Sequence, residues 1–388
     1  MIGGMYMKAI TNAKVVLENG IIWDGTIIIK NGKIVKVGKS SEIPIDGTTD
    51  VIDACGAYVG PGFVDIHVHG GNGFCTSFDT EQAANFFLQH GETTILATPC
   101  FEFNFDEFMD ALRSIKSVMD SGKAKNVKGI YCEGPYTNAN YGALADLNPW
   151  KNKVITQQYK AFVDEGGQYV KVWTIAPELE GIMGFVEYAR KVNPNVIFSL
   201  GHSEAAPMEI RALGAYKPKI LVHAMCATGR RPVFDFTRGY GPDEYCFKEP
   251  DMYAELISDS CGIHVHPELQ QLLVHTKGYH RVILITDSTV YDEPAPENLK
   301  HIKDLCFDHN GTLAGSRLTM DCACRNIMSH TNCGIAQAFL MASTNPARAL
   351  GLDKEIGSVE IGKIADLVFV DDMFNVKQVM LGGEIQVF

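Results

Sequence analysis

The 388-residue sequence lacks the features that would place it in a membrane or in an oxidising compartment. No apolar run approaches the roughly 20 residues that a membrane-spanning helix needs. The first segment, MIGGMYMKAITNAKVV, has no long apolar stretch of the kind found in secretory signals. The eleven cysteines form no CxxC pair, and only Cys322 and Cys324 stand close together. We therefore expect reduced thiols and a cytoplasmic protein.

Positive charge is also scarce. The chain has 34 Lys and Arg against 46 Asp and Glu, which gives a formal net charge of −12. No basic tract offsets this surplus, and an acidic surface repels both nucleic-acid phosphates and anionic lipids. We expect no nucleic-acid partner and no membrane partner. An anionic substrate would have to be held by local arginines or by a metal.

No internal repeat or low-complexity tract interrupts the chain. Its two ends share the same pattern of alternating apolar and polar residues. Residues 8–55 alternate apolar and polar positions around the turn pairs Asn19-Gly20 and Asn31-Gly32, a pattern typical of hairpins. The segment from Gly357 onward repeats this alternation. Short hairpins alone cannot bury a core. We therefore predict that residues 1–58 and 352–388 pair into one small β-sandwich domain.

The middle of the chain alternates strand-like and helical segments. Helical patterns occupy, for example, residues 80–91 and 105–122. Eight apolar, strand-like runs lie at 62–68, 93–99, 127–133, 169–178, 196–202, 219–225, 252–259 and 281–287. Strands that alternate with helices form parallel sheets, and eight such units close a barrel. The sequence thus predicts an α/β fold, a TIM-type (β/α)8 barrel over residues 59–351.

Polar side chains with metal-binding chemistry mark the ends of five of these runs. Taken singly, each has an ordinary explanation: a histidine at a strand end is commonly a half-buried, hydrogen-bonded residue, and a carboxylate there can cap a turn. The carboxyl ends of barrel strands converge on one site, however, and residues i and i+2 of a strand share a face. Together these residues predict one or two divalent ions per chain, Zn²⁺ or Fe²⁺. They are His67, His69, Glu133, His202, His223 and Asp287.

The motifs that carry these residues resemble a known family. PGFVDIHVHG and the ending NPARALGL…GSVEIGKIADLVFVD are similar to the amidohydrolase superfamily of metal-dependent barrel hydrolases. Within it, EGPY, SLGHSEA, GIHVHPE, LITDST and LAGSRLTMD most resemble the N-acetylglucosamine-6-phosphate deacetylases, over essentially the whole chain. The resemblance implies a homodimer that hydrolyses the N-acetyl group of an amino-sugar phosphate, releasing glucosamine 6-phosphate and acetate from N-acetylglucosamine 6-phosphate.

The resemblance also implies roles for individual residues. Glu133, His202 and His223 would hold the main metal, while His67, His69 and Asp287 would help hold a second. Asp287 would also act as the general base. His264 and either Arg230 or Arg231 are the candidate anion holders, with Arg230 favoured by its place in the motif. The arginine would come from the partner subunit of the dimer.

The predicted substrate pocket departs from the family pattern. Where relatives carry H-x-x-N-A, this chain reads HAMCA, so that Cys226 and Ala227 occupy the phosphate-contacting positions. Leu144 stands where relatives have a histidine or glutamine near the sugar. These departures keep open a second hypothesis, an amidohydrolase that acts on another amide or on a cyclic ureide. A barrel that binds without catalysis is a third, which the full set of ligand-type residues disfavours.

Overall fold

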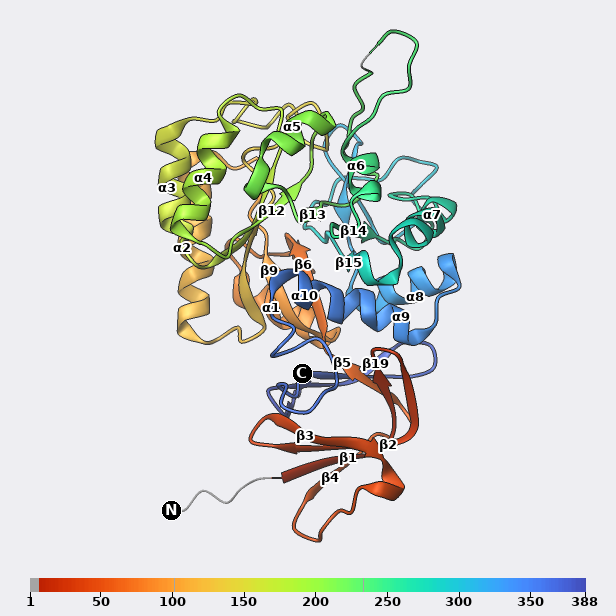
Figure 1. Ribbon diagram of the computed structural model, residues 1–388. Coiled ribbons are helices and arrows are strands. Elements are labelled where there is room, and N and C mark those ends of the chain that lie inside the picture. Colours follow the sequence, from red (N-terminus) through yellow and green to blue (C-terminus); the bar gives the residue numbers. More distant parts are fainter. Residues whose placement is uncertain (1–6, 101, 233) are drawn as a thin grey trace.

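The computed structural model describes residues 7–100, 102–232 and 234–388. A barrel of strands surrounded by helices forms the upper part of the molecule, and a smaller sheet lies below it (Figure 1). The first and the last described strands both belong to the smaller sheet, so the chain enters the barrel from this sheet and returns to it.

The barrel contains the eight predicted strands in one parallel sheet, which confirms the predicted fold class. The neighbours run in the order β15-β14-β13-β12-β11-β10-β9-β6. The two edges meet where the backbone N–H of Asp287 donates to the carbonyl of His67 at 3.0 Å, so the sheet is nearly closed. The strands are β6 (Phe63–Val68), β9 (Glu92–Ala97), β10 (Val127–Cys132), β11 (Val170–Ile175), β12 (Ile197–Leu200), β13 (Ile220–Leu221), β14 (Tyr253–Ile257) and β15 (Val282–Ile285).

Helices cover the outside of this sheet, and the two helices predicted at 80–91 and 105–122 are both present. The main helices are α1 (Thr80–Gln89), α2 (Phe105–Ser121), α3 (Thr156–Gly166), α4 (Ile182–Val192), α5 (Pro207–Ala212), α6 (Pro242–Lys248), α7 (Pro267–Lys277) and α8 (Met320–Thr331). The segment α9 (Ile335–Phe339), η4 (Leu340–Thr344) and α10 (Asn345–Leu350) completes the layer. Single 3-10 turns lie at η1 (Ser40–Glu42), η2 (Gly214–Tyr216) and η3 (Tyr279–Arg281).

Helix α2 illustrates how local sequence sets these bounds. The side chain of Asn104 accepts hydrogen bonds from the backbone N–H groups of Asp106 and Glu107, and Glu107 accepts one from the N–H of Asn104 in return. This reciprocal cap satisfies donors that a helix start leaves unpaired. Gly122, at φ 68°, then ends the helix in a left-handed conformation that glycine adopts without a steric penalty.

Two layers of apolar side chains hold the barrel together. Leu96, Leu256 and Ile283 lie buried in one cluster, which extends to side chains of α8. Phe108 and Phe162 belong to a second cluster, in which α2 packs on β10 and α3 packs on α2. Because both faces of each strand are covered, the strands consist of nearly continuous apolar residues rather than alternating ones.

The smaller sheet is built from both ends of the chain, as predicted. β1 pairs with β2 and β2 with β3, and the turn at Asn31 and Gly32 has the positive φ angles, 51° and 74°, that tight hairpins require. β18 pairs antiparallel with β5, placing Phe369 opposite Val59. The strands are β1 (Met7–Leu17), β2 (Gly20–Lys30), β3 (Lys33–Lys39), β4 (Asp50–Asp53), β5 (Tyr58–Pro61), β18 (Leu367–Val370), β19 (Val376–Leu381) and β20 (Glu384–Ile385). The domain boundaries stay a prediction.

Two short hairpins stand apart from both sheets. They are β7 (Gly70–Gly71) with β8 (Phe74–Cys75), and β16 (Leu305–Phe307) with β17 (Leu313–Ser316). Across residues 7–100, 102–232 and 234–388, no helix combines the length and apolar character needed to cross a bilayer.

Candidate metal centre and active site

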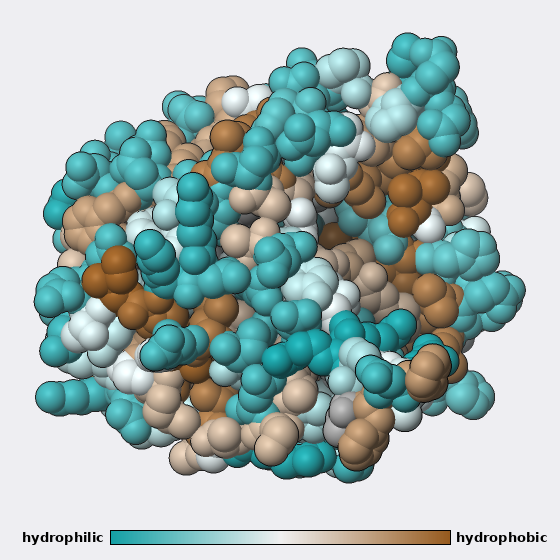
Figure 2. Space-filling model, turned by 90° about the horizontal axis from the view of Figure 1, so that it is seen from above, coloured by the Kyte–Doolittle hydropathy of each residue, from teal (hydrophilic) through white to brown (hydrophobic). Residues whose placement is uncertain are grey.

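The six predicted ligand residues meet at the carboxyl ends of the barrel strands. Figure 2 looks down on this upper face, where the surface is hollowed. One histidine lies within β6 and the next follows it directly; the others stand one to two residues after β10, β12, β13 and β15, and all are buried. They are His67, His69, Glu133, His202, His223 and Asp287. The predicted convergence of these side chains is therefore present in the fold.

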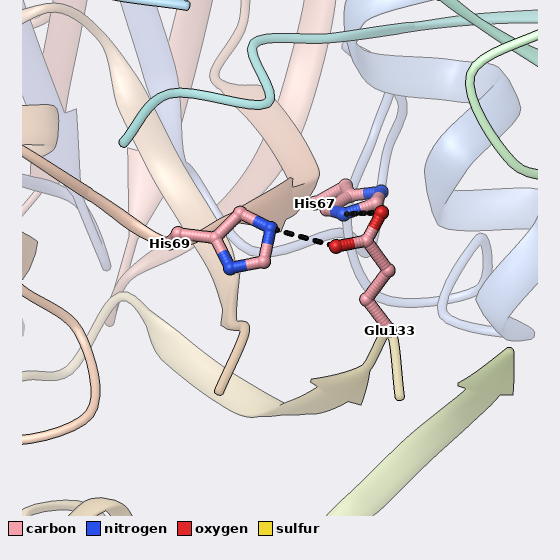
Figure 3. A group of neighbouring side chains, drawn as sticks. All are labelled: His67, His69 and Glu133. Atoms are coloured by element: carbon pink, nitrogen blue, oxygen red, sulfur yellow. Dashed lines mark ion pairs between the residues drawn. The ribbon is translucent and has the colours of Figure 1, made fainter. Parts of the chain in front are cut away.

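Glu133 lies at the centre of the group. Its Oε2 atom is 3.1 Å from Nε2 of His69, and its Oε1 atom is 3.5 Å from Nε2 of His67 (Figure 3). The same Oε1 atom lies 3.0 Å from Nε2 of His202 and 2.9 Å from Nε2 of His223. A carboxylate with imidazoles on both of its sides is suited to bridge two cations.

The ligand atoms fall into two groups that share Glu133. His67, His69 and Glu133 form one group and Glu133, His202 and His223 the other, with the ligand atoms of each within 4.8 Å of one another. Asp287 adjoins the first group, since its Oδ1 atom is 3.4 Å from Nε2 of His69. Nitrogen and carboxylate donors in these numbers suit Zn²⁺ and related divalent ions.

Surrounding groups fix three of the four imidazoles. Nδ1 of His67 lies 3.2 Å from Oε2 of Glu255, Nδ1 of His202 lies 3.1 Å from the carbonyl of Tyr141, and Nδ1 of His223 lies 3.3 Å from the carbonyl of Cys226. An acceptor at Nδ1 holds the proton there and leaves Nε2 available as a ligand. The Nε2 atoms of these rings are the ones that face Glu133.

The electrostatics of the centre also fit a cation. Although burial opposes ionisation, His67 and His202 hold the pKa of the Glu133 carboxyl well below its usual range. Burial would likewise lower the pKa of His69, but Asp287 and Glu133 raise the pKa of that ring to about 9. The buried carboxylates thus draw positive charge onto the imidazoles. A divalent ion would supply that charge in place of protons.

The backbone at these strand ends adopts conformations that are rare for non-glycine residues. His202, His223 and Asp287 have φ angles of 36°, 21° and 48°. Such conformations persist where the surrounding structure imposes them, and they cluster at functional sites. Gly142 contributes a related constraint, because a Cβ atom there would lie 2.4 Å from Cε1 of His202. The loop after β10 therefore packs directly on a ligand ring.

A cavity of about 350 Å³ opens above the ligands, within the range of small-molecule sites. The predicted substrate residues Leu144, Cys226, Ala227 and His264 all line it. Asp259 orients His264 through a 3.1 Å contact to Nδ1, and Nε2 of the ring is buried without a hydrogen-bond partner among the described residues. That nitrogen is the atom available to a substrate oxygen. Burial raises the pKa of the Cys226 thiol, so Cys226 offers a neutral group.

Neither of the two candidate arginines lines the cavity of its own chain. Nε of Arg230 lies 2.6 Å from Oε1 of Glu244, and its side chain is half exposed. Arg231 pairs with Glu209 and donates from Nε to the carbonyl of Glu204 at 2.9 Å. In this arrangement, neither arginine is placed to bind an anion in the cavity of its own chain. Contribution from a partner subunit stays a prediction.

Sequence reasoning missed several groups at the site. Glu255 lies in β14, where its carboxylate accepts from His67 and from the backbone N–H of His223 at 3.2 Å. The signal for it was a charged residue inside an otherwise apolar run, MYAELISD. Glu102 and Tyr291 line the cavity and form a hydrogen bond with each other. No spacing rule points to that pair, because it joins loops that are far apart in the sequence.

Comparisons with known proteins agree with this geometry. The model of the amidohydrolase family matches residues 58–386. An N-acetylglucosamine-6-phosphate deacetylase from Vibrio furnissii is 30% identical, over 84% of this chain and 82% of that protein. One from Bacillus subtilis is 29% identical, over 97% of this chain and 96% of the other.

Comparison with solved structures also finds N-acetylglucosamine-6-phosphate deacetylases. An alanine mutant of the Mycobacterium smegmatis N-acetyl-D-glucosamine-6-phosphate deacetylase, in complex with N-acetyl-D-glucosamine-6-phosphate, superposes with a TM-score of 0.81 at 26% identity, over 98% of this chain and 99% of that one. Because the family model matches most of its length, and its barrel brings histidines and carboxylates together at the strand ends, the chain belongs to the amidohydrolase family.

Proposed function

We propose that the protein hydrolyses the N-acetyl amide of an amino-sugar phosphate, converting N-acetylglucosamine 6-phosphate to glucosamine 6-phosphate and acetate. The observation that carries this proposal is Glu133, whose carboxylate is shared by both ligand groups: Oε2 faces His69, and Oε1 faces His67, His202 and His223. The similarity to deacetylases over nearly the whole chain supports this substrate class.

The proposed cofactor is a pair of divalent ions, Zn²⁺ or Fe²⁺. His202 and His223 would hold one ion and His67 and His69 the other, with Glu133 shared between them. When bound, such ions lower the pKa of water and polarise a carbonyl group, which is the chemistry that amide hydrolysis needs.

Asp287 is the proposed proton carrier. Although burial opposes ionisation, the hydrogen bond from His69 lowers the pKa of the Asp287 carboxyl, so it is ionised and able to accept a proton. It lines the cavity beside the ligand residues, within reach of a reacting group. As general base it would accept a proton from the attacking water and return it to the departing amine nitrogen.

The far side of the cavity would bind the sugar phosphate. Nε2 of His264 is a buried atom that lacks a hydrogen-bond partner among the described residues, and Cys226 and Ala227, on the loop after β13, line the same cavity. The sulfur of Cys226 contacts the carbonyl of His264 at 3.4 Å, which links the two loops. A phosphate at this place would still lack a guanidinium, because Arg230 pairs with Glu244.

We infer that the missing guanidinium comes from a second copy of the chain. In a cytoplasmic homodimer, Arg230 of one subunit would reach the cavity of the other and meet two phosphate oxygens at once. Light scattering should give twice the chain mass. An Arg230→Ala variant should raise KM for phosphorylated substrates much more than it lowers kcat.

Acetate release from N-acetylglucosamine 6-phosphate, measured together with metal content by plasma mass spectrometry, tests the proposal. We expect turnover that requires about two ions per chain, and much weaker turnover of unphosphorylated N-acetylglucosamine. The galactosamine epimer should be assayed in parallel, because a similar protein from Escherichia coli is an N-acetylgalactosamine-6-phosphate deacetylase. Activity restricted to non-sugar amides or cyclic ureides would overturn the proposal.

A further inference from the structure

One wall of the cavity carries polar atoms that the proposed hydrolysis of an acetyl group does not use. Oε2 of Glu102 and Oγ1 of Thr289 are both buried, and neither has a hydrogen-bond partner among the described residues. Both residues line the cavity. Buried polar atoms are nearly always hydrogen-bonded in folded proteins, so two unpaired ones beside an active site indicate a ligand group that completes them.

Hydrogen bonds from residues behind Glu102 fix the orientation of its carboxylate. The hydroxyl of Tyr291 donates to Oε1 of Glu102, which leaves Oε2 as the free acceptor. Burial raises the pKa of Tyr291, so its phenol keeps its proton and acts as the donor. Arg317 in turn donates to the carbonyl of Tyr291 at 3.1 Å and to the side chain of Asp292 at 2.8 Å. The orientation of the carboxylate is thus built into the fold.

The barrel order shows which part of a substrate reaches this wall. Glu102 follows β9, whereas Cys226 and Ala227 follow β13. In the ring of strands, β10, β11 and β12 separate β9 from β13 on one side, and β6, β15 and β14 separate them on the other. A substrate with its phosphate near Cys226 and its amide over the ligand residues therefore extends its acyl group towards Glu102.

From this arrangement, which rests on the proposed function, we propose that Glu102 and Thr289 select an acyl group that carries a hydroxyl. A hydroxyacetyl amide would donate its hydroxyl hydrogen to Oε2 of Glu102 and accept a hydrogen bond from Oγ1 of Thr289. The methyl group of an acetyl amide does neither, and it would face a buried carboxylate. The substrate class is then N-hydroxyacetyl amino-sugar phosphates, with the N-acetyl compound as the poorer substrate.

The test compares kcat/KM for N-hydroxyacetylglucosamine 6-phosphate and N-acetylglucosamine 6-phosphate with the metal-loaded enzyme. Because a site built to bind a hydroxyl discriminates against the analogue that lacks it, we expect at least about a tenfold preference for the hydroxyacetyl compound. Glu102→Met, which keeps the side-chain length without the charge, should lower that ratio about tenfold or more. Thr289→Val, which keeps the shape without the hydroxyl, should lower it less.

Two further variants make the result specific. Glu102→Gln keeps one acceptor oxygen and a polar end, so it should retain more of the preference than Glu102→Met. Glu180→Gln, an exposed carboxylate before α4, should leave the ratio unchanged. If Glu102→Met reduces kcat/KM equally for both substrates, Glu102 binds the sugar or supports the fold, and the inference is wrong.

The outcomes also separate this inference from the proposed function. If kcat/KM of the wild-type enzyme is the same for the acetyl and the hydroxyacetyl compounds, the acyl preference is refuted, but the proposed deacetylation is not. If neither compound is hydrolysed, both proposals fall. A preference that disappears in Glu102→Met and is reduced in Thr289→Val supports both.

Discussion

Replacing Glu255 tests how the ligand imidazoles are held. Oε2 of Glu255 lies 3.2 Å from Nδ1 of His67 and accepts from the backbone N–H of His223 at 3.2 Å, and the side chain is fully buried. One carboxylate therefore orients a ligand from each metal group. Removing such an outer partner typically costs ten- to a hundredfold in metal affinity, which is about 1.4–2.8 kcal/mol.

The two replacements of Glu255 should differ in a defined way. In Glu255→Gln, the amide oxygen can keep both hydrogen bonds and only the charge is lost, so we expect about a tenfold weaker metal affinity. In Glu255→Ala, two buried donors lose their acceptor, at about 1–3 kcal/mol each, and a cavity remains. We expect about a hundredfold weaker affinity and a lower melting temperature in the metal-free protein.

Competition with a chromophoric chelator measures the affinity, and calorimetry measures the melting temperature. Glu92 provides the matched control. It is also a fully buried carboxylate, but it begins β9 at the other end of the barrel, where its Oε1 atom accepts from the backbone N–H of Met320 at 2.8 Å. Glu92→Gln should lower the melting temperature without changing metal affinity. Unchanged affinity in Glu255→Ala would refute the role assigned to Glu255.

Four further results are expected. Asp287→Asn should lower kcat by about 10²- to 10⁴-fold with little change in substrate binding, measured by steady-state kinetics and calorimetry, and an unchanged kcat would contradict the general-base role. Dialysis against a chelator should abolish turnover and lower the melting temperature, and added Zn²⁺ should restore both, because bound ions stabilise only the folded state. Gly142→Ala should reduce metal content, measured by mass spectrometry, since its Cβ atom would meet the ring of His202 and its φ of 88° disfavours alanine. Burial alone would raise the pKa of Asp259, but hydrogen bonds, first from His264, lower it to about 2 from 3.8. The stabilisation that ionised Asp259 gives the folded state is therefore present above about pH 4 and is lost as the pH falls towards 2. The free energy of unfolding in urea should therefore fall less between pH 5 and pH 3 in Asp259→Asn than in the wild type.

The strands and the convergence of the six candidate ligands could be predicted from sequence because each depends on local chemistry. GFVDIHVHG is apolar up to Ile66 except for Asp65 and then places two imidazoles two residues apart, and a strand puts such residues on one face. Asn31-Gly32 specifies a tight turn for the same kind of reason, since its positive φ angles suit those two residues.

The substrate side of the site was less accessible to such reasoning. Leu144, Cys226, Ala227 and His264 line the cavity as expected, but the motif position of Arg230 gave no sign of its pairing with Glu244. The ion-pair partner of a long side chain on a loop depends on which helix packs beside it, and here α6 places Glu244 next to Arg230.

The amino-acid sequence by itself determined the barrel, the union of the two ends in one sheet, and which histidines and carboxylates converge at the strand ends, because periodicity and residue chemistry are properties of short segments. Only the tertiary structure showed that Glu255 contacts a residue of each candidate ligand group and that Glu102, Thr289 and Tyr291 line one cavity. These groups come from strands and loops far apart along the chain. Closure of the barrel, which joins β15 to β6, is what brings them together.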